Sequence, residues 1–305
     1  MARPLLMQDG GDAIAHRVKN MAGTDRAENA AERAALRDVL SELDACLARD
    51  AEPGSGRRRR CGLLVEQLRT TAAAFLQPEL EHRLARHVDA DDSFARDRIA
   101  HVLAGACGEA ALPALLRARE TDRNDDGDTL ELDVLGLFEA WPETSLRLVL
   151  GCTDSDEPRT RRVGLWGLSI LDFGGTRHFE LIARAAYDPD PQVRADMMST
   201  LGSVFGSGDP QRARAILIAG TSDAAPEVRR AAVGALSSVR DEMVTDILVV
   251  RAGDQDRWVR YSAAWALARR PAPEARAALE RLTTDEDAVV RDAAREVLAL
   301  PVKFA

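Results

Sequence analysis

The chain has 305 residues and a formal net charge of −9; 46% of its residues are hydrophobic and only 4% are aromatic. The net negative charge disfavours nucleic acid as the partner, because phosphate contacts require a basic surface. With so few aromatic residues, the core must consist of Ala, Leu and Val, whose small or straight side chains suit closely packed helices.

The composition predicts a cytoplasmic protein that does not enter a membrane. Its four cysteines are scattered without a Cys-x-x-Cys pair, as expected for buried thiols in a reducing compartment: Cys46, Cys61, Cys107 and Cys152. The apolar patch within residues 1–12 is too short for a secretory signal. No run approaches the roughly 20 apolar residues that a membrane helix needs.

The N-terminal part is predicted to be irregular. Residues 1–23 form a flexible start with a short helix, and residues 24–77 form a pair of helices. The pair is interrupted by a linker over 51–60, where Pro and Gly break the helix. We interpret Arg57–Arg60 as a solvated basic loop; the alternative is a docking site for acidic groups.

Residues 78–305 are predicted to form an array of seven helix pairs, from the apolar periodicity. The expected pairs are 78–88 with 93–106, 110–120 with 130–140, 143–150 with 159–171, 177–187 with 192–205, 212–219 with 227–239, 243–251 with 257–270, and 274–282 with 288–300. Prolines support these boundaries, since Pro158, Pro191 and Pro226 stand where second helices start and where Pro costs no hydrogen bond.

A motif recurs in the second helices and is clearest at Asp256–Leu267, which reads Asp-x-x-Val-Arg-x-x-Ala-x-x-Ala-Leu. Its arginines mark the repeat and lie 33, 35, 31 and 31 residues apart: Arg161, Arg194, Arg229, Arg260 and Arg291. A period of this length is typical of a solenoid, in which each unit buries its apolar face against its neighbours.

This motif resembles the short HEAT-like repeat, the type also seen in phycobilin lyases, over roughly residues 78–300. The resemblance implies an all-α fold, an α-α superhelix. In the family, the Asp and Arg of the motif form a polar ladder between neighbouring repeats. That role is carried over to six residues: Asp190, Arg194, Asp256, Arg260, Asp287 and Arg291. The three aspartates also stand where a carboxylate can cap the start of a helix.

The resemblance also implies that the second helices line a concave surface. At 100° per residue, positions +1, +5 and +8 after each marker arginine face away from the core. From these positions we predict a partner-binding groove that includes His101, Phe138, Arg162, Trp166, Arg230, Tyr261 and Trp265. Small residues between the aromatic ones form its floor: Ala195, Ser199, Gly202, Gly234 and Ser237. Alternatively, Trp166 and Trp265 turn sideways into the core between repeats.

One acidic stretch, residues 122–133, resembles an EF-hand calcium loop, with Asp122, Asn124, Asp126, Gly127 and Asp133 at loop positions 1, 3, 5, 6 and 12. It departs from that pattern, because Thr129 replaces an apolar residue, Asp133 replaces Glu, and the chain has no partner loop. We interpret it as an acidic turn. The five histidines form no zinc-ligand pattern, and we assign no metal, cofactor or catalytic residue.

The sequence therefore favours a non-catalytic scaffold that holds a protein or peptide in a concave groove. One alternative is a HEAT-like alkylpurine DNA glycosylase, which uses Trp, Arg and Asp on its concave side; the net charge has the wrong sign for binding a duplex. Another is a lyase or chaperone subunit for a tetrapyrrole or other biosynthetic intermediate.

Overall fold

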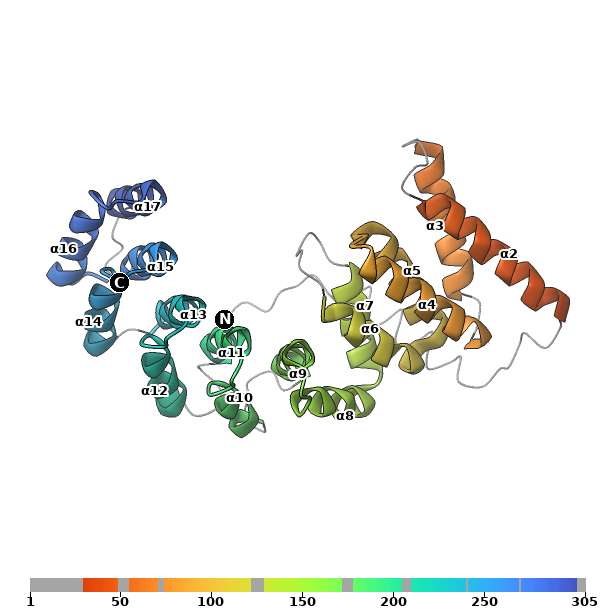
Figure 1. Ribbon diagram of the computed structural model, residues 1–305, viewed down its shortest axis with the longest axis horizontal. Coiled ribbons are helices and arrows are strands. Elements are labelled where there is room, and N and C mark those ends of the chain that lie inside the picture. Colours follow the sequence, from red (N-terminus) through yellow and green to blue (C-terminus); the bar gives the residue numbers. More distant parts are fainter. Residues whose placement is uncertain are drawn as a thin grey trace. The chain divides into compact units, whose positions relative to one another are not determined.

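The computed structural model describes residues 30–48, 55–70, 74–121, 129–171, 178–204, 210–239, 241–268 and 270–300. All regular structure within these ranges is helical (Figure 1). The chain divides into two compact units, Met1–Leu148 and Val149–Ala305. The predicted all-α solenoid of helix pairs is confirmed.

Unit 1 contains the N-terminal pair, two full repeats and the first part of α8. Its helices are α2 (Ala30–Leu47), α3 (Ser55–Thr70), η1 (Ala74–Leu76), α4 (Gln77–Asp89), α5 (Ser93–Cys107), η2 (Gly108–Ala111), α6 (Leu112–Arg119), α7 (Thr129–Ala140) and the start of α8 (Pro142–Thr153). Helix α3 packs on both α2 and α5, and α5 packs on α7.

The end of the predicted linker, including the four arginines that we expected in a loop, is helical in the structure. Helix α3 begins at Ser55, so its first turns include residues 55–60, which the sequence assigned to the linker. Arg57–Arg60 therefore lie on a helix. Arg60, in the first turns of α3, donates a hydrogen bond from Nε to the carboxylate of Glu42 on α2 at 2.6 Å.

One segment of unit 1, Ser93–Arg119, has the length and mean hydropathy (1.6) of a membrane span, although no such run was expected from the sequence. In the structure it is two helices, α5 and α6, separated by the 3-10 turn η2. In the most apolar 18-residue stretch of this segment, 67% is buried inside the protein. The apolar run fills the core, where α5 is covered on several sides by α3, α4 and α7.

Unit 2 contains the more regular repeats. Its helices are the end of α8, α9 (Pro158–Leu171), α10 (Phe179–Ala185), α11 (Pro191–Val204), α12 (Pro210–Gly220), α13 (Pro226–Leu236), α14 (Glu242–Arg251), α15 (Arg257–Leu267), α16 (Pro273–Leu282) and α17 (Ala288–Ala299). The second helices, α9, α11, α13, α15 and α17, lie on the inner side of an arc, and the first helices lie on its outer side (Figure 1).

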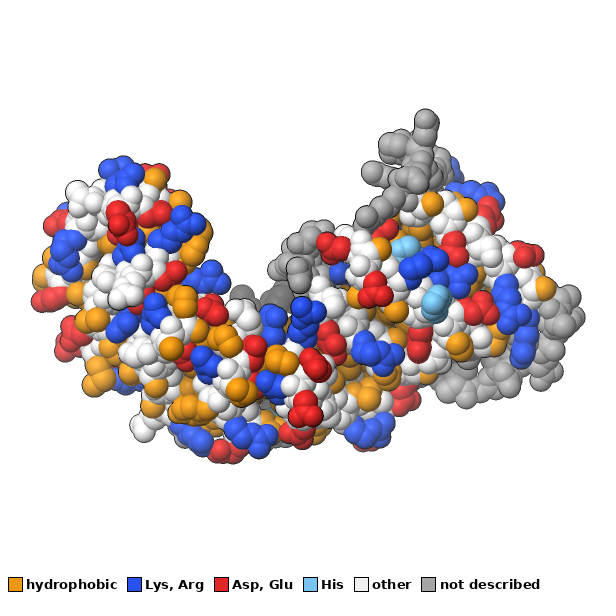
Figure 2. Space-filling model, viewed as in Figure 1, with side chains coloured by type: hydrophobic (Ala, Val, Ile, Leu, Met, Phe, Trp, Pro, Cys, Tyr) orange, Lys and Arg blue, Asp and Glu red, His pale blue; other side chains and the backbone are white. Residues whose placement is uncertain are grey.

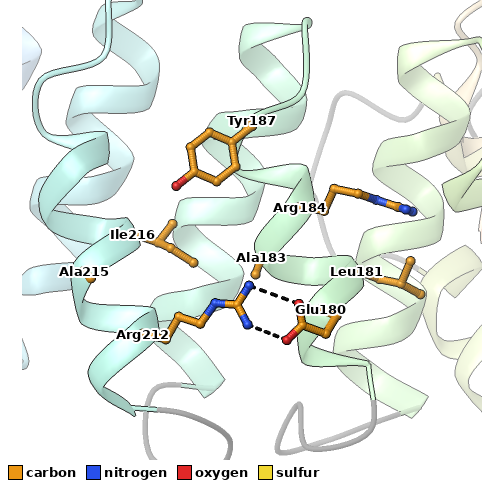
Figure 3. A pocket seen from close by; sticks show the side chains of 8 residues that line it. All are labelled: Glu180, Leu181, Ala183, Arg184, Tyr187, Arg212, Ala215 and Ile216. Atoms are coloured by element: carbon orange, nitrogen blue, oxygen red, sulfur yellow. Dashed lines mark hydrogen bonds and ion pairs between the residues drawn. The ribbon is translucent and has the colours of Figure 1, made fainter.

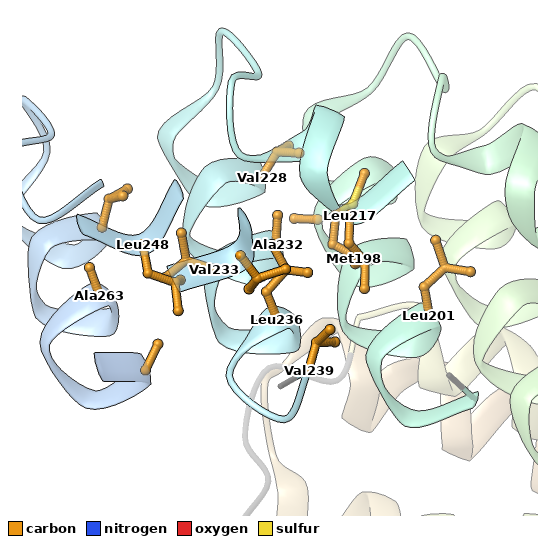
Figure 4. Close-up of a cluster of buried hydrophobic side chains, with 14 of the residues drawn as sticks. Met198, Leu201, Leu217, Val228, Ala232, Val233, Leu236, Val239, Leu248 and Ala263 are labelled. Carbon is orange, nitrogen blue, oxygen red and sulfur yellow. The ribbon is translucent and has the colours of Figure 1, made fainter. Parts of the chain in front are cut away.

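The core of unit 2 is continuous from repeat to repeat and consists of small and medium side chains. Around α13 it includes Met198, Leu217, Val233, Leu236 and Leu248, all buried (Figure 4). The positions just before and three residues after the marker arginine are fully buried in the last four repeats, as the motif predicts: Val193 and Met197, Val228 and Ala232, Val259 and Ala263, Val290 and Ala294. The small residues allow consecutive second helices to pack directly on each other.

Candidate functional site

The marker arginines join consecutive repeats of unit 2 through paired hydrogen bonds to a carboxylate of the next repeat. Arg194 donates from Nε and Nη2 to Asp223 at 2.9 and 2.8 Å, and its Nη1 donates to the carbonyls of Asp188 and Pro189 in its own turn. The same arrangement recurs at four rungs: Arg161–Asp188, Arg194–Asp223, Arg229–Asp254 and Arg260–Asp285. We call these four pairs the arginine ladder.

The predicted aspartates of the ladder were partly wrong. Asp190 and Asp256 cap their own helices: Asp256, for example, accepts from the backbone N–H groups of Trp258 and Val259 at 2.9 and 3.1 Å. Asp287 caps α17 and also accepts from Arg257 of the preceding repeat at 3.1 Å. The rungs use the aspartate two residues before the cap position, because the turn brings that residue within reach of the preceding repeat.

A sequence signal for the true rungs was present. Asp stands six residues before the marker arginine in each of the last four repeats: Asp188, Asp223, Asp254 and Asp285. Each also accepts from the backbone N–H two residues further on, at 2.9 to 3.0 Å, which fixes the turn. Arg291, in the last repeat, donates to the carbonyls of Asp285 and Glu286 in its own turn.

Hydrogen bonding shifts the pKa values of the ladder groups. The guanidinium of Arg194 and the backbone N–H of Ala225 hold the pKa of Asp223 below its usual value, although partial burial acts in the opposite direction. The bond to Asp223 raises the pKa of Arg194. Both groups therefore stay charged at neutral pH.

The second helices form a hollow of about 470 Å³ on the inner side of unit 2, which we call the concave hollow. It is lined by small or hydroxyl-bearing residues and one cation: Ser199, Gly202, Arg230, Ala231, Gly234, Ala235, Ser237, Ser238 and Ser262. Helices α11, α13 and α15 and the turn that follows α13 supply these residues. The predicted floor residues Ser199, Gly202, Gly234 and Ser237 and the predicted site residue Arg230 thus lie together, and the sequence missed Ser238 and Ser262.

Two glycines of the concave hollow explain its shape. A Cβ on Gly202 would lie 2.7 Å from the Cβ of Ala235, so the absence of a side chain lets α11 and α13 approach closely. A Cβ on Gly234 would meet nothing within 4 Å. The first glycine brings the helices together, and the second leaves the space above α13 open.

An aromatic row on α15 flanks the concave hollow. The rings of Trp258 and Tyr261 lie 5.8 Å apart, and those of Tyr261 and Trp265 lie 6.4 Å apart, both edge-to-face. Tyr261 and Trp265 are half-buried and pack against the core. The position of Trp265 therefore lies between the exposed one that we predicted and the sideways alternative. Trp258 is more exposed and was missed, because its position precedes the marker arginine.

Arg162 and Trp166 on α9, which we predicted to contact a partner, are less available for such contact than expected. Arg162 donates from Nε to Asp196 of α11 at 2.6 Å, so its charge is compensated within the protein. Trp166 is half-buried. Neither lines the concave hollow.

Phe138 was wrongly assigned to the groove, because it is buried, with 2% of its surface exposed. Helix α7 lacks the marker arginine, so its orientation had no such reference in the sequence. Its outward residues are Leu132, Leu135 and Glu139, and the exposed position near its end is thus one residue after Phe138. Leu132 is an exposed apolar residue that the sequence did not reveal.

His101, in unit 1, belongs to a different local environment. Its Nδ1 lies 2.7 Å from Oδ1 of Asp133, a carboxylate that is only 5% exposed. Burial raises the pKa of Asp133, while the hydrogen bond and charge of His101 lower it. The second oxygen of Asp133 is buried and has no partner among the described residues.

The acidic stretch that resembles a calcium loop falls mostly outside the described residues, which omit 122–128. Within the described part, Thr129 donates to Asp97 at 2.8 Å and Asp133 binds His101, so both side chains engage α5. The described residues contain no cluster of His, Cys, Asp and Glu that could hold a metal ion.

A second hollow, of about 590 Å³, lies between the first helices α10 and α12 on the outer side of unit 2 (Figure 3). It is lined by Glu180, Leu181, Ala183, Arg184, Tyr187, Arg212, Ala215 and Ile216. Arg212 forms an ion pair with Glu180 and stacks on Phe179, with 5.5 Å between the guanidinium carbon and the ring centroid. Tyr187 is highly exposed at its rim, in a turn whose orientation the helical periodicity does not predict.

Charged side chains of both signs are interspersed on the face of each unit shown in Figure 2. Arginines lie among aspartates and glutamates there. That face presents no continuous basic surface of the kind that binds a nucleic-acid backbone.

Comparisons with known proteins agree with the repeat architecture. Residues 214–299 match the family model of HEAT repeats. None of the curated proteins matches the sequence.

Several solved structures are similar at low identity. The Escherichia coli protein YibA is 16% identical with a TM-score of 0.47, over 91% of this chain and 100% of that chain. A designed armadillo repeat protein in complex with the peptide (KR)4 is 16% identical with a TM-score of 0.43, over 72% of this chain and 98% of that one. An engineered protein is 15% identical with a TM-score of 0.40, over 93% and 87%.

The marker arginines and the helix pairs that carry them extend the pattern of the matched segment towards the N-terminus, as far as α8 and α9. The repeat motif, the helix pairs and the match over residues 214–299 together show that this chain carries HEAT-like repeats.

Proposed function

We propose that this protein is a non-catalytic binding scaffold, which holds a protein or peptide partner in the concave hollow over α11, α13 and α15. The observation that carries the proposal is the open space above Gly234 at the centre of a surface whose other lining residues are small or hydroxyl-bearing, apart from Arg230. A backbone can approach such a floor closely, and its amide groups can bond to the serine hydroxyls.

The residues that line the concave hollow are better suited to binding a partner than to catalysing a reaction. Its polar groups are hydroxyls and one guanidinium, and no carboxylate, imidazole or thiol that could act as a general base is among its lining residues. The aromatic row on α15 adds side chains of the type that most often anchor an interface. We further propose that the protein acts in the cytoplasm, as the scattered cysteines suggest.

The test fills the hollow without disturbing the core. Gly234→Gln adds a neutral side chain where a Cβ meets nothing, and Gly151→Gln makes the same change at an equally open glycine on α8, a first helix. Wild-type protein is used to select binders from an immobilised library of 12-residue peptides. We expect Gly234→Gln to weaken the selected peptides by about 10-fold or more, as loss of a central contact does, and Gly151→Gln to leave them unchanged.

The proposal fails if no peptide is selected, or if the selected peptides bind Gly234→Gln as well as they bind the wild type. Circular dichroism of both variants checks that the helices are intact.

A further inference from the structure

Among the described residues that line the concave hollow, Arg230 alone is charged, and it is exposed. Its neighbours on the inner side are compensated: Arg162 pairs with Asp196, and Arg257 pairs with Asp287. The adjacent Arg229 is a rung of the arginine ladder. Within the part of the chain that the structure describes, the guanidinium of Arg230 has no such carboxylate partner.

Both arginines that line the outer hollow, Arg184 and Arg212, have carboxylate partners; Nη2 of Arg184 lies 3.6 Å from Asp154. In the outer hollow, Arg212 is held by Glu180 (Figure 3). A cation there is already neutralised by the protein, whereas the concave hollow presents a cation with no lining carboxylate. The chemical complement of the concave hollow is therefore an anion.

We propose that the concave hollow binds a peptide segment of a partner protein through an Asp or Glu side chain, whose carboxylate pairs with Arg230. This inference rests on the proposed scaffold function. A guanidinium can bind a carboxylate through two parallel hydrogen bonds, which fixes both the position and the orientation of the acidic residue. The hydroxyls of Ser237 and Ser262 line the same hollow and can bond to the backbone of the peptide.

The aromatic row sets a second feature of the peptide. Ser262 lines the hollow from α15, and Tyr261 and Trp265 lie one residue before it and three after it on the same helix. Residues three apart, such as Ser262 and Trp265, are neighbours on a helix surface. A peptide whose acidic residue reaches Arg230 therefore places an adjacent residue against this aromatic side, where an apolar side chain is favoured.

The test uses a library in which every 12-residue peptide is present in two forms, one with Asp and Glu and one with Asn and Gln in their place. We expect the acidic forms to be selected by the full-length protein. For a selected peptide, we expect the amide form and the Arg230→Ala variant each to lower the affinity by about 10-fold, because each removes one partner of a charged hydrogen-bonded pair.

Arg281→Ala is the matched control, because Arg281 is an exposed arginine on the first helix α16. It removes the same charge away from the hollow and is expected to leave the affinity unchanged. Raising the salt concentration should weaken binding to the wild type more than binding to Arg230→Ala, because the pair is ionic.

The outcomes separate this inference from the proposed function. If peptides bind and are lost in Gly234→Gln, but the amide forms bind equally well or Arg230→Ala has no effect, the acidic partner is wrong and the scaffold stands. If Gly234→Gln has no effect, the proposed function fails, and the inference fails with it.

Discussion

Gly202 and Gly234 lie on neighbouring helices, α11 and α13, and both line the concave hollow. Their surroundings differ, since a Cβ on Gly202 would overlap Ala235 and a Cβ on Gly234 would meet open space. One residue type thus serves two purposes within a single site, close packing and an open floor.

For these two glycines we predict opposite effects of alanine on stability. Gly234→Ala should raise the free energy of unfolding by about 0.5–1 kcal/mol, because Ala is the better helix former and meets no neighbour. Gly202→Ala should lower it by about 1–3 kcal/mol, because the helices must move apart. Urea denaturation followed by circular dichroism measures both, and effects of the same sign would contradict the prediction.

The pair His101 and Asp133 shows how a single polar residue can occupy a core position. Asp133 is only 5% exposed and lies among the buried apolar residues of α7. His101 provides the hydrogen bond that makes the buried carboxylate tolerable.

Removing His101 should therefore destabilise unit 1 more than removing the pair. We expect His101→Ala to lower the free energy of unfolding by roughly 2–3 kcal/mol, because it leaves a buried carboxylate without its partner. Adding Asp133→Ala should recover most of the loss, since it removes the buried carboxylate itself. Chemical denaturation of the two variants tests this, and a double variant no more stable than His101→Ala would refute it.

At the scale of the helix and its turn, one short segment performs three tasks. In the turn between the first and second helix of a repeat, one aspartate accepts hydrogen bonds from the arginine of the preceding repeat. The aspartate two residues further on caps the second helix. The backbone carbonyls of the turn accept hydrogen bonds from the arginine of that second helix. The last repeat but one shows all three, at Asp254, Asp256 and Arg260. The turn is therefore fixed from both sides, and this sets the register between repeats.

The ladder should make stability depend on pH in acid. The pKa of Asp223 is lowered in the folded protein by the bond from Arg194. Its contribution is therefore complete above the ordinary value of 3.8 and is lost as the pH falls below that value towards the lower folded-state pKa. We expect Asp223→Asn to be less stable than the wild type at pH 7, and the gap to narrow as the pH approaches 3.

Urea denaturation of both proteins between pH 7 and pH 3 measures that gap. A gap of constant size across the range would show that the charge of Asp223 does not stabilise the fold. Asp246→Asn, at a residue for which we find no ladder bond, serves as the control.

At the scale of the whole molecule, the repeats of unit 2 contact mainly their neighbours. Consecutive second helices pack on each other from α9 to α17, and the core runs through them without interruption. In such an array, stability is the sum of local terms, and a weakened contact between two repeats has its effect nearby.

Arg260→Ala should therefore loosen one end of unit 2 and leave unit 1 unaffected. Arg260 bonds to Asp285 of the next repeat through two nitrogens, at 2.8 and 2.9 Å. We expect amide hydrogen exchange in α16 and α17 to accelerate by about 10-fold or more, with no change in α4–α7. Arg276→Ala, which removes only an exposed pair with Glu280, should have little effect. Uniform acceleration along the chain would contradict a local response.

The sequence by itself determined the helices, their pairing and the repeat. Apolar residues at helical spacing, prolines at the starts of helices and one arginine per repeat depend on local geometry, which the sequence encodes directly. The capping role of Asp190, Asp256 and Asp287 followed in the same way, because a cap bonds only to residues two or three positions away.

Only the tertiary structure decided which of the candidate side chains are exposed and uncompensated, and so available to a binding partner. Periodicity gives the face of a helix, but the neighbouring helix, some thirty residues away in sequence, decides whether that face is covered or its charge is compensated. Phe138 turned out to be buried because α7 is rotated, and Arg162 met Asp196, whereas Arg230 met no carboxylate. The contacts that cover or neutralise a residue form between elements, and no spacing within one helix reveals them.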